Sequence, residues 1–295
     1  MDLNVENFLQ YLSKERNYSL NTVQAYENDL REFSEFCEKR FAKDVLSVGV
    51  SDVREWIVEM SDGSGAVGVR TVKRRISALR SFYKYLRREG LVKKNPAAVL
   101  VLPKASKPLP KFFREEEMDK VFDDVLTGDE FLDRRDKLII DLFYQTGVRV
   151  SELVEIRDAD VDTGRGVLRV FGKRRKERLI PIGDKLIREI EAYKQQRNAE
   201  VGRTAELFVR RGGEKMYRRG VYDVVHNYMS KVSTQGKRSP HVLRHTFAST
   251  MLNNGADIYV VKALLGHSSL AATEVYTHAS FAKLMRTYRT AHPRA

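Results

Sequence analysis

The sequence predicts a mainly α-helical protein of two domains: a helical N-terminal bundle, and a mostly helical C-terminal domain with a small antiparallel β-sheet. Two observations support this fold class. Apolar residues recur every three or four positions over much of the 295 residues, which is the period of amphipathic helices. Four prolines between residues 95 and 111 interrupt this pattern, as expected of a linker. We therefore expect one domain at 1–106 and a second at 107–295.

Four helices are expected in the N-terminal domain. The first follows the apolar residues from Val5 to Leu12, and Ser19 can cap the second. The third runs from Asp52 through Met60, and the glycine-rich stretch 63–68 separates it from a fourth helix at 69–86. Together these helices predict a small bundle with an apolar interior.

The fourth helix and the residues after it are strongly basic. Residues 70–94 hold ten lysines and arginines against a single acidic residue, Glu89. A solvated helix face usually mixes both signs, so this surplus predicts contact with phosphates. The net charge of +13 also favours a polyanionic partner such as nucleic acid over an ordinary basic protein. The residues predicted to bind DNA are Arg70, Lys73, Arg74, Arg75, Arg80 and Lys84, with Arg174 and Arg175 in a later basic loop.

The C-terminal domain is expected to combine helices with one hairpin. Two short apolar runs, Val167–Phe171 and Arg178–Ile182, flank the basic sequence GKRRKE and predict an antiparallel pair of strands. Glycines 147, 255 and 266 follow helical runs and are expected to end helices. Helices are predicted at 115–126, 133–145, 184–200, 219–232, 241–253, 257–264, 270–277 and 281–289.

Composition excludes several classes of protein. A hydrophobic content of 42% is enough for packed cores and argues against a disordered chain. A lone cysteine, Cys37, allows no disulfide within the chain, which is typical of a reducing compartment. The N-terminus MDLNVENFLQ lacks the features of a signal peptide, and no apolar run approaches the ~18 residues of a membrane helix. We expect a cytoplasmic protein without membrane contact.

Two turns in the C-terminal half carry candidate anion-binding residues. Arg149 lies in TGVRVSEL, where a salt bridge to Glu152 is the simpler interpretation. Pro240 can begin a helix in SPHVLRHTFAS, and the spacing of three places His241 and Arg244 on one face of it. A helix N-terminus already favours an anion, and the added imidazole and guanidinium would form a phosphate cradle.

A metal site is the rival interpretation of this helix. His241 and His245 stand four residues apart, as zinc ligands do. The zinc-protease helix needs a glutamate directly after its first histidine, and here Val242 occupies that position. Arg244 would also place a positive charge beside a dication. We therefore predict that the protein needs neither a metal nor another cofactor.

Three further residues could complete a reactive site. His267 follows a glycine in LLGHSS, where a histidine is commonly a cap or surface residue. Tyr276 in TEVYTHAS would ordinarily belong to the core, but its neighbours are polar, and a tyrosine can attack a phosphodiester. Lys173 at the hairpin tip is either a solvated charge or a general acid for a leaving 5′ oxygen.

The five motifs TGVRVSEL, FGKRRKERLIPI, SPHVLRHTFAS, LLGHSS and TEVYTH resemble, in order and spacing, those of the tyrosine recombinases, most closely the bacterial Xer-type enzymes. The resemblance covers essentially the whole chain, and the N-terminal part is similar to the family's SAM-like core-DNA-binding domain. It implies a site-specific recombinase that acts without metal or ATP on double-stranded DNA. It further implies a homo- or hetero-tetramer on two sites, chromosome dimer resolution at cell division, and a septal DNA translocase as a partner.

The resemblance also implies the roles of the site residues. Tyr276 would be the nucleophile that forms a 3′-phosphotyrosyl bond and releases a 5′-hydroxyl. Arg149 and Arg244 would hold the non-bridging oxygens and offset the charge of the transition state. His241 and His267 would bond the phosphate and assist proton transfer to and from the tyrosine.

Two supporting roles follow from the same resemblance. Lys173 would protonate the departing 5′ oxygen, and Glu152 would support the first arginine. The family often has Gly-Lys-Gly at this hairpin where the chain has Gly-Lys-Arg, so Arg174, Arg175 and Lys176 compete with the lysine for its role.

Several other functions share parts of this pattern. Integrases and invertases of mobile elements carry the same motifs, although the compact length, without an arm-binding domain before residue 1, favours the Xer role. A type IB topoisomerase-like enzyme would use the same covalent chemistry alone. A non-catalytic regulator would use only the basic face at 70–94, and a metal-dependent hydrolase is the least favoured alternative.

Overall fold

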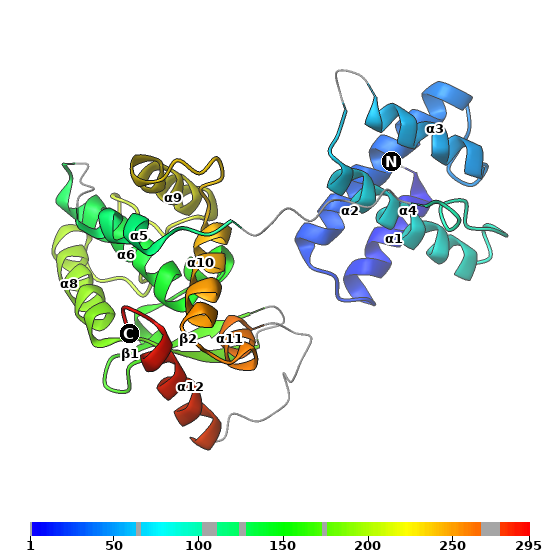
Figure 1. Ribbon diagram of the computed structural model, residues 1–295. Helices are drawn as coiled ribbons and strands as arrows, with labels where there is room; N and C mark the ends of the chain where they lie inside the picture. Colours follow the sequence, from blue (N-terminus) through cyan, green and yellow to red (C-terminus); the bar gives the residue numbers. More distant parts are fainter. Residues whose placement is uncertain (1, 63–65, 102–110, 124–127, 173–175, 267–277) are drawn as a thin grey trace. The chain divides into compact units, whose positions relative to one another are not determined.

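The computed structural model describes residues 2–62, 66–101, 111–123, 128–172, 176–266 and 278–295, and it divides into two compact units, Met1–Pro108 and Leu109–Ala295 (Figure 1). Each unit has its own hydrophobic core. Helices predominate in both units and a small sheet occurs in the second, which confirms the predicted mainly α fold class. Within the described ranges, none of the helices combines the length and apolar character that crossing a lipid bilayer requires.

All four predicted helices of the N-terminal unit are present. They are α1 (Leu3–Lys14), α2 (Leu20–Phe41), α3 (Val50–Ser61) and α4 (Val69–Arg88). The hydroxyl of Ser19 accepts a hydrogen bond from the backbone N–H of Thr22 at the start of α2, so the predicted cap is confirmed.

An aromatic core holds these helices together. Phe8 of α1 packs against Phe82 of α4 with ring centroids 5.4 Å apart, and Phe33 of α2 packs against Trp56 of α3 at 4.8 Å. All four side chains are almost completely buried. Aromatic pairs of this kind add to the hydrophobic stabilisation of the core. Because one side of α4 is committed to this core, its basic residues lie on the remaining faces.

The helices of the C-terminal unit follow the predicted ones closely. Seven of the predicted segments appear within a few residues of their expected bounds; the segment 270–277 lies outside the described residues. A helix of four residues, α7, was not predicted. The helices are α5 (Glu115–Asp123), α6 (Glu130–Thr146), α7 (Val150–Leu153), α8 (Asp184–Val201), α9 (Arg218–Val232), α10 (Pro240–Asn253), α11 (Ile258–Leu265) and α12 (His278–Ala291).

A three-stranded antiparallel sheet forms one part of this unit. Its order is β1 (Val161–Asp162), β2 (Val167–Phe171) and β3 (Glu177–Pro181), preceded by a short 3₁₀ turn, η1 (Asp158–Asp160). The predicted hairpin is confirmed, with its second strand one residue earlier than expected. At its tip the N–H of Gly172 donates to the carbonyl of Lys176 at 2.7 Å.

The end of α6 fixes the backbone from which the candidate site begins. Helix α6 is buried along most of its length and packs against α8 and α10. It stops at Gly147, whose φ of 58° is left-handed, so the predicted stop is confirmed. A Cβ at this position would lie 2.5 Å from Cδ1 of Phe247 and 2.7 Å from Cδ2 of Leu265. The turn therefore needs glycine for both its conformation and its close packing.

Candidate active site

Arg149 and Glu152 form the ion pair that the sequence suggested. Arg149 caps α7, and its backbone N–H donates to Oε2 of Glu152 at 2.8 Å. Its Nη1 donates to Oε1 of the same carboxylate, also at 2.8 Å. The glutamate side chain is 2% exposed, whereas the arginine side chain is 38% exposed. The guanidinium is therefore held on its inner side and open on its outer side.

Arg178 of β3 is a third member of this cluster that the sequence reasoning missed. Its Nη1 and Nη2 donate to Oε1 and Oε2 of Glu152 at 2.9 and 2.7 Å. Its Nε donates to the carbonyl of Leu264 at 2.7 Å. The strand alternates in burial, so Arg178 shares the inward face with Ile180, two residues later. A charged residue in phase with buried apolar residues was the signal that could have identified it.

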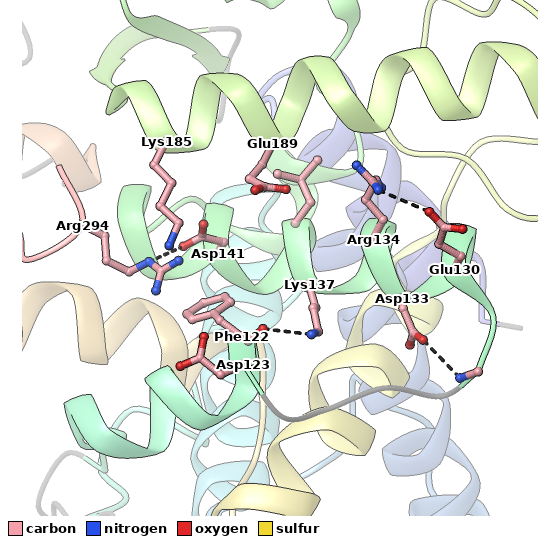
Figure 2. A pocket seen from close by; sticks show the side chains of 12 residues that line it. Phe122, Asp123, Glu130, Asp133, Arg134, Lys137, Asp141, Lys185, Glu189 and Arg294 are labelled. Atoms are coloured by element: carbon pink, nitrogen blue, oxygen red, sulfur yellow. Dashed lines mark hydrogen bonds and ion pairs between the residues drawn. The ribbon is translucent and has the colours of Figure 1, made fainter.

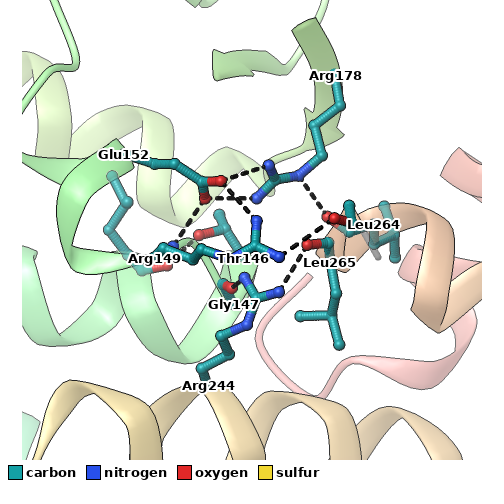
Figure 3. A network of polar contacts seen from close by, with 10 residues as sticks. Thr146, Gly147, Arg149, Glu152, Arg178, Arg244, Leu264 and Leu265 are labelled. Carbon is teal, nitrogen blue, oxygen red and sulfur yellow. Dashed lines mark hydrogen bonds and ion pairs between the residues drawn. The ribbon is translucent and has the colours of Figure 1, made fainter. Parts of the chain in front are cut away.

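Arg244 of α10 joins the ends of two other helices. Its Nη1 donates to the carbonyl of Gly147 at the end of α6, and its Nη2 donates to the carbonyl of Leu265 at 2.6 Å. Arg149 adds a bond from Nη2 to the carbonyl of Gly266 at 3.2 Å. The last carbonyls of a helix lack internal donors and carry partial negative charge. Figure 3 shows the three guanidiniums converging on this end of α11.

The charged groups of this cluster shift one another's pKa values. Burial would raise the pKa of Glu152, but hydrogen bonds and charge from Arg178, together with those from Arg149, lower it to about 2. Burial and the charges of Arg149 and Arg178 lower the pKa of Arg244 to about 9, which still leaves it cationic at neutral pH. The network thus holds three guanidiniums and one carboxylate, which is bound by two of them, and the excess positive charge favours an anionic ligand.

His241 lies in the first turn of α10, which begins at Pro240 as predicted. The residue reaches the surface, and its ring makes an edge contact with Tyr222, with centroids 6.5 Å apart. Partial burial, Lys237, His245 and then Arg244 and Arg149 lower the pKa of His241. The imidazole is thus neutral at pH 7 and able to accept a proton.

Several predicted site residues lie outside the described residues, namely Lys173, Arg174, Arg175, His267 and Tyr276. The structure therefore brings together Arg149, Glu152, His241 and Arg244 of the predicted set. Among the residues it describes, no group of three or more His, Cys, Asp or Glu side chains is arranged to hold a metal ion. The predicted roles of the whole set stay predictions.

The basic residues of α4 fall into two groups. Arg74 and Arg75 pair with Asp29 of α2, and Arg75 pairs in addition with Glu32 and is only 13% exposed. Arg80 donates from Nε to the carbonyl of Ala97 at 2.9 Å and from Nη2 to that of Leu100. These three side chains therefore have structural contacts within the unit. The other predicted DNA contacts on α4 are exposed or partly exposed: Arg70, Lys73 and Lys84.

A cavity of about 570 Å³ lies between α5, α6, α8 and the C-terminal tail (Figure 2). The tail supplies Arg294, whose Nε lies 3.3 Å from Oδ1 of the buried Asp141 and whose guanidinium stacks 4.0 Å from the ring centroid of Phe122. Just before it, Nε2 of His292 lies 3.0 Å from the carbonyl oxygen of Tyr144. The C-terminal tail therefore packs on its own unit and forms one wall of this cavity.

Two family models match the chain over both units. The model described as the phage integrase family matches residues 111–283, and the model described as the phage integrase N-terminal SAM-like domain matches residues 5–90. The second match agrees with the SAM-like character expected of the N-terminal domain. It also includes all four helices of the first unit except the N-terminal end of α1.

Similar proteins have been characterised by sequence and by structure. The chain is 40% identical over 294 residues to tyrosine recombinase XerC of Listeria monocytogenes serotype 4a, covering 98% of this chain and 97% of that protein. A crystal structure of XerH site-specific recombinase bound to difH substrate superposes with a TM-score of 0.69 at 21% identity, over 93% of this chain and 80% of that one. A lambda integrase tetramer bound to a Holliday junction gives 0.69 at 16%, over 90% and 74%. The two structures share the fold.

Proposed function

Because this chain belongs to the phage integrase family and is a site-specific DNA recombinase of the Xer type, we propose that it cuts and rejoins DNA through a phosphotyrosyl bond at Tyr276. The observation that carries this proposal is the cluster of Arg149, Arg178 and Arg244, in which the first two bind Glu152 and the third binds the ends of α6 and α11. Arg149 is held from behind and 38% exposed, so its open edge is available to the non-bridging oxygens of a phosphodiester. Arg244 adds a second positive charge beside it.

On this proposal the reaction needs no external energy source. The Tyr276 oxygen attacks phosphorus, the bond from phosphorus to the 5′ oxygen breaks, and the 5′ oxygen receives a proton from Lys173. Attack by a 5′-hydroxyl reverses these steps and reseals the strand, because the phosphotyrosyl bond conserves the ester. A free tyrosine has a pKa of about 10, so it is a poor nucleophile at neutral pH without help. The arginines favour tyrosinate and stabilise the phosphorane.

The histidines would handle the proton of the nucleophile. His241 is neutral at pH 7 because its pKa is lowered, so it can accept the tyrosine proton in cleavage and return it in ligation. We assign His267 to a hydrogen bond with the phosphate and to the same proton transfer. In both cleavage and ligation, the two imidazoles would act beside the phosphate that the arginines hold.

The N-terminal domain, 1–106, would bind the core DNA site while the domain 107–295 cleaves it. The exposed Arg70 and Lys84 of α4 are the natural contacts with phosphates, because they are free of the internal bonds that Arg80 makes. Arg174 and Arg175 would add contacts at the hairpin. We extend the proposal to a homo- or hetero-tetramer that resolves chromosome dimers in the cytoplasm, with a septal DNA translocase as its activator.

Covalent trapping tests this function. A nicked suicide duplex that carries the chain's own recombination site should become attached to the wild-type protein in the presence of excess EDTA, and should not become attached to Tyr276→Phe. Tyr259→Phe provides the matched control, because Tyr259 is an exposed tyrosine on α11 at 64% exposure. Binding of the duplex should survive both substitutions. Adducts formed by Tyr276→Phe would disprove the nucleophile, and adducts lost in EDTA would disprove the metal-independent mechanism.

A further inference from the structure

Arg178 has contacts that reach beyond its own strand. Its side chain is 6% exposed, and its Nε, Nη1 and Nη2 each donate a hydrogen bond. Two of these bonds pair it bidentately with Glu152, and the third reaches the last turn of α11. None of the roles assigned above uses this residue.

The carboxylate of Glu152 is shared between two arginines. Oε1 accepts from Nη1 of Arg149 and Nη1 of Arg178, while Oε2 accepts from the backbone N–H of Arg149 and Nη2 of Arg178. A carboxylate offers about four lone-pair sites, so this one is filled. Without Arg178, a buried carboxylate would be left to Arg149 alone, and that guanidinium would be drawn away from its open position.

Two glycines lie beside the Arg178 guanidinium. A Cβ on Gly266 would lie 3.0 Å from its Nη1, and a Cβ on Gly172 would lie 4.0 Å from the same atom. The guanidinium therefore occupies a narrow slot between the end of α11 and the hairpin. A lysine ammonium would keep the charge but could not span both carboxylate oxygens and the Leu264 carbonyl from one position.

We propose that Arg178 is a positioning residue for strand cleavage, which holds Glu152 and through it sets the guanidinium of Arg149 against the scissile phosphate. This inference rests on the proposed function, because it takes Arg149 as the group that binds the phosphate. It does not require Arg178 to touch DNA. Its effect is transmitted by the two oxygens of one carboxylate.

A double-substitution cycle tests the inference. The rate of covalent adduct formation is measured with the full-length protein and a suicide duplex for Arg178→Lys, Arg149→Lys and the double variant. We expect Arg178→Lys alone to slow cleavage about 100-fold, since a misplaced phosphate-binding group costs about this much. The double variant should be no slower than Arg149→Lys alone. Once Arg149 is replaced, no guanidinium remains at 149 for Arg178 to position through Glu152.

The controls separate positioning from folding. Arg169→Lys on the neighbouring strand breaks a similar pair, in which Nε and Nη2 lie 3.1 and 3.0 Å from Oδ1 of Asp160, and it should leave the rate within about twofold of wild type. Glu152→Gln keeps all three arginines and is run through the same cycle with Arg149→Lys. If Arg178→Lys does not fold, this second cycle tests whether the carboxylate positions Arg149. Effects of the 152 and 149 substitutions that multiply would then overturn the inference.

The outcomes are distinct. If the effects of the 178 and 149 substitutions multiply, or if Arg178→Lys cleaves at the wild-type rate, Arg178 does not act through Arg149 and the inference is overturned. The proposed function survives either result, provided that the wild-type protein forms adducts. If the wild-type protein forms none, the proposed function fails and the inference falls with it.

Discussion

The carbonyl oxygen of Gly147 accepts a hydrogen bond from Nη1 of Arg244, 97 residues further along the chain. The residue that ends α6 thus also fixes the guanidinium that projects from α10. Arg149 lies two residues after this glycine. Both arginines that we expect to hold the phosphate are therefore positioned by the same turn. A change in the backbone geometry of this turn should therefore affect both the stability of the C-terminal unit and the rate of DNA cleavage.

Gly147→Ala should destabilise the C-terminal unit strongly. The left-handed φ of 58° costs an alanine about 1–2 kcal/mol, and the contacts at 2.5 and 2.7 Å require Phe247 and Leu265 to move, at about 1–3 kcal/mol more. Gly255→Ala is the matched control, since its φ of +83° is also left-handed but nothing lies within 4 Å of the added carbon. Chemical denaturation should show the larger loss for position 147, and equal losses would contradict the packing argument.

Glu152 should make stability depend on acid pH. Its pKa falls from 4.5 in the unfolded chain to about 2 in the folded one, a shift worth about 3 kcal/mol at neutral pH. Because the folded pKa is the lower one, this stabilisation is complete above about pH 4.5 and disappears as the pH falls through about 2. Urea unfolding between pH 6 and 2 should show wild type approaching Glu152→Gln. The exposed Glu116→Gln should parallel wild type throughout, and a constant gap between wild type and Glu152→Gln would refute the linkage.

Proton transfer by His241 predicts the shape of the cleavage pH profile. The pKa of His241 is lowered from 6.5, so the imidazole is neutral and active at pH 7 and becomes protonated only at lower pH. Single-turnover cleavage should therefore stay level around pH 7 and decline only at a pH below the ordinary imidazole value of 6.5. His241→Gln should be slower and should lose this decline, whereas His245→Gln, on an exposed position of the same helix, should keep it. A decline retained in His241→Gln would assign it to another group.

Substitutions of Lys84 and Arg80 should have different effects, the first on DNA binding and the second on the stability of the N-terminal unit. Lys84 is exposed on α4, so Lys84→Gln should weaken DNA binding, reduce the slope of log affinity against log salt by about 1, and leave unfolding unchanged. Arg80→Gln removes bonds to the carbonyls of Ala97 and Leu100, so it should lower the unfolding temperature of the N-terminal unit. Titrations at several salt concentrations and thermal unfolding check both. An unchanged salt slope for Lys84→Gln would exclude it from the DNA contact.

Local signals in the sequence were sufficient for most of the fold. The period of apolar residues located the helices because each buries one face. The helix ends at Ser19, Pro240 and Gly147 could be predicted because they depend on residues that are neighbours in the sequence. The four-residue α7 and the two-residue β1 were missed because such short segments show no period.

The candidate site was only partly accessible from sequence, because its contacts are distant along the chain. The pair of Arg149 with Glu152 spans three residues and could be predicted. Arg178 reaches Glu152 across 26 positions and Leu264 across 86, and no local pattern encodes such contacts. The same limit applies to Arg75, which looked like a free cation until α2 placed Asp29 and Glu32 beside it.

The arginine bonds at the end of α11 have a consequence for the helix itself. An α-helix that continued past Gly266 would offer the carbonyls of residues 264–266 to its own next amides. Arg178, Arg244 and Arg149 occupy these acceptors instead, and they come from a strand, a second helix and a turn. The end of α11, marked by its own left-handed glycine, is thus also bound by remote parts of the chain. Residues 258–266 transplanted into a foreign scaffold would keep their glycine but lose the cations that bind the last carbonyls.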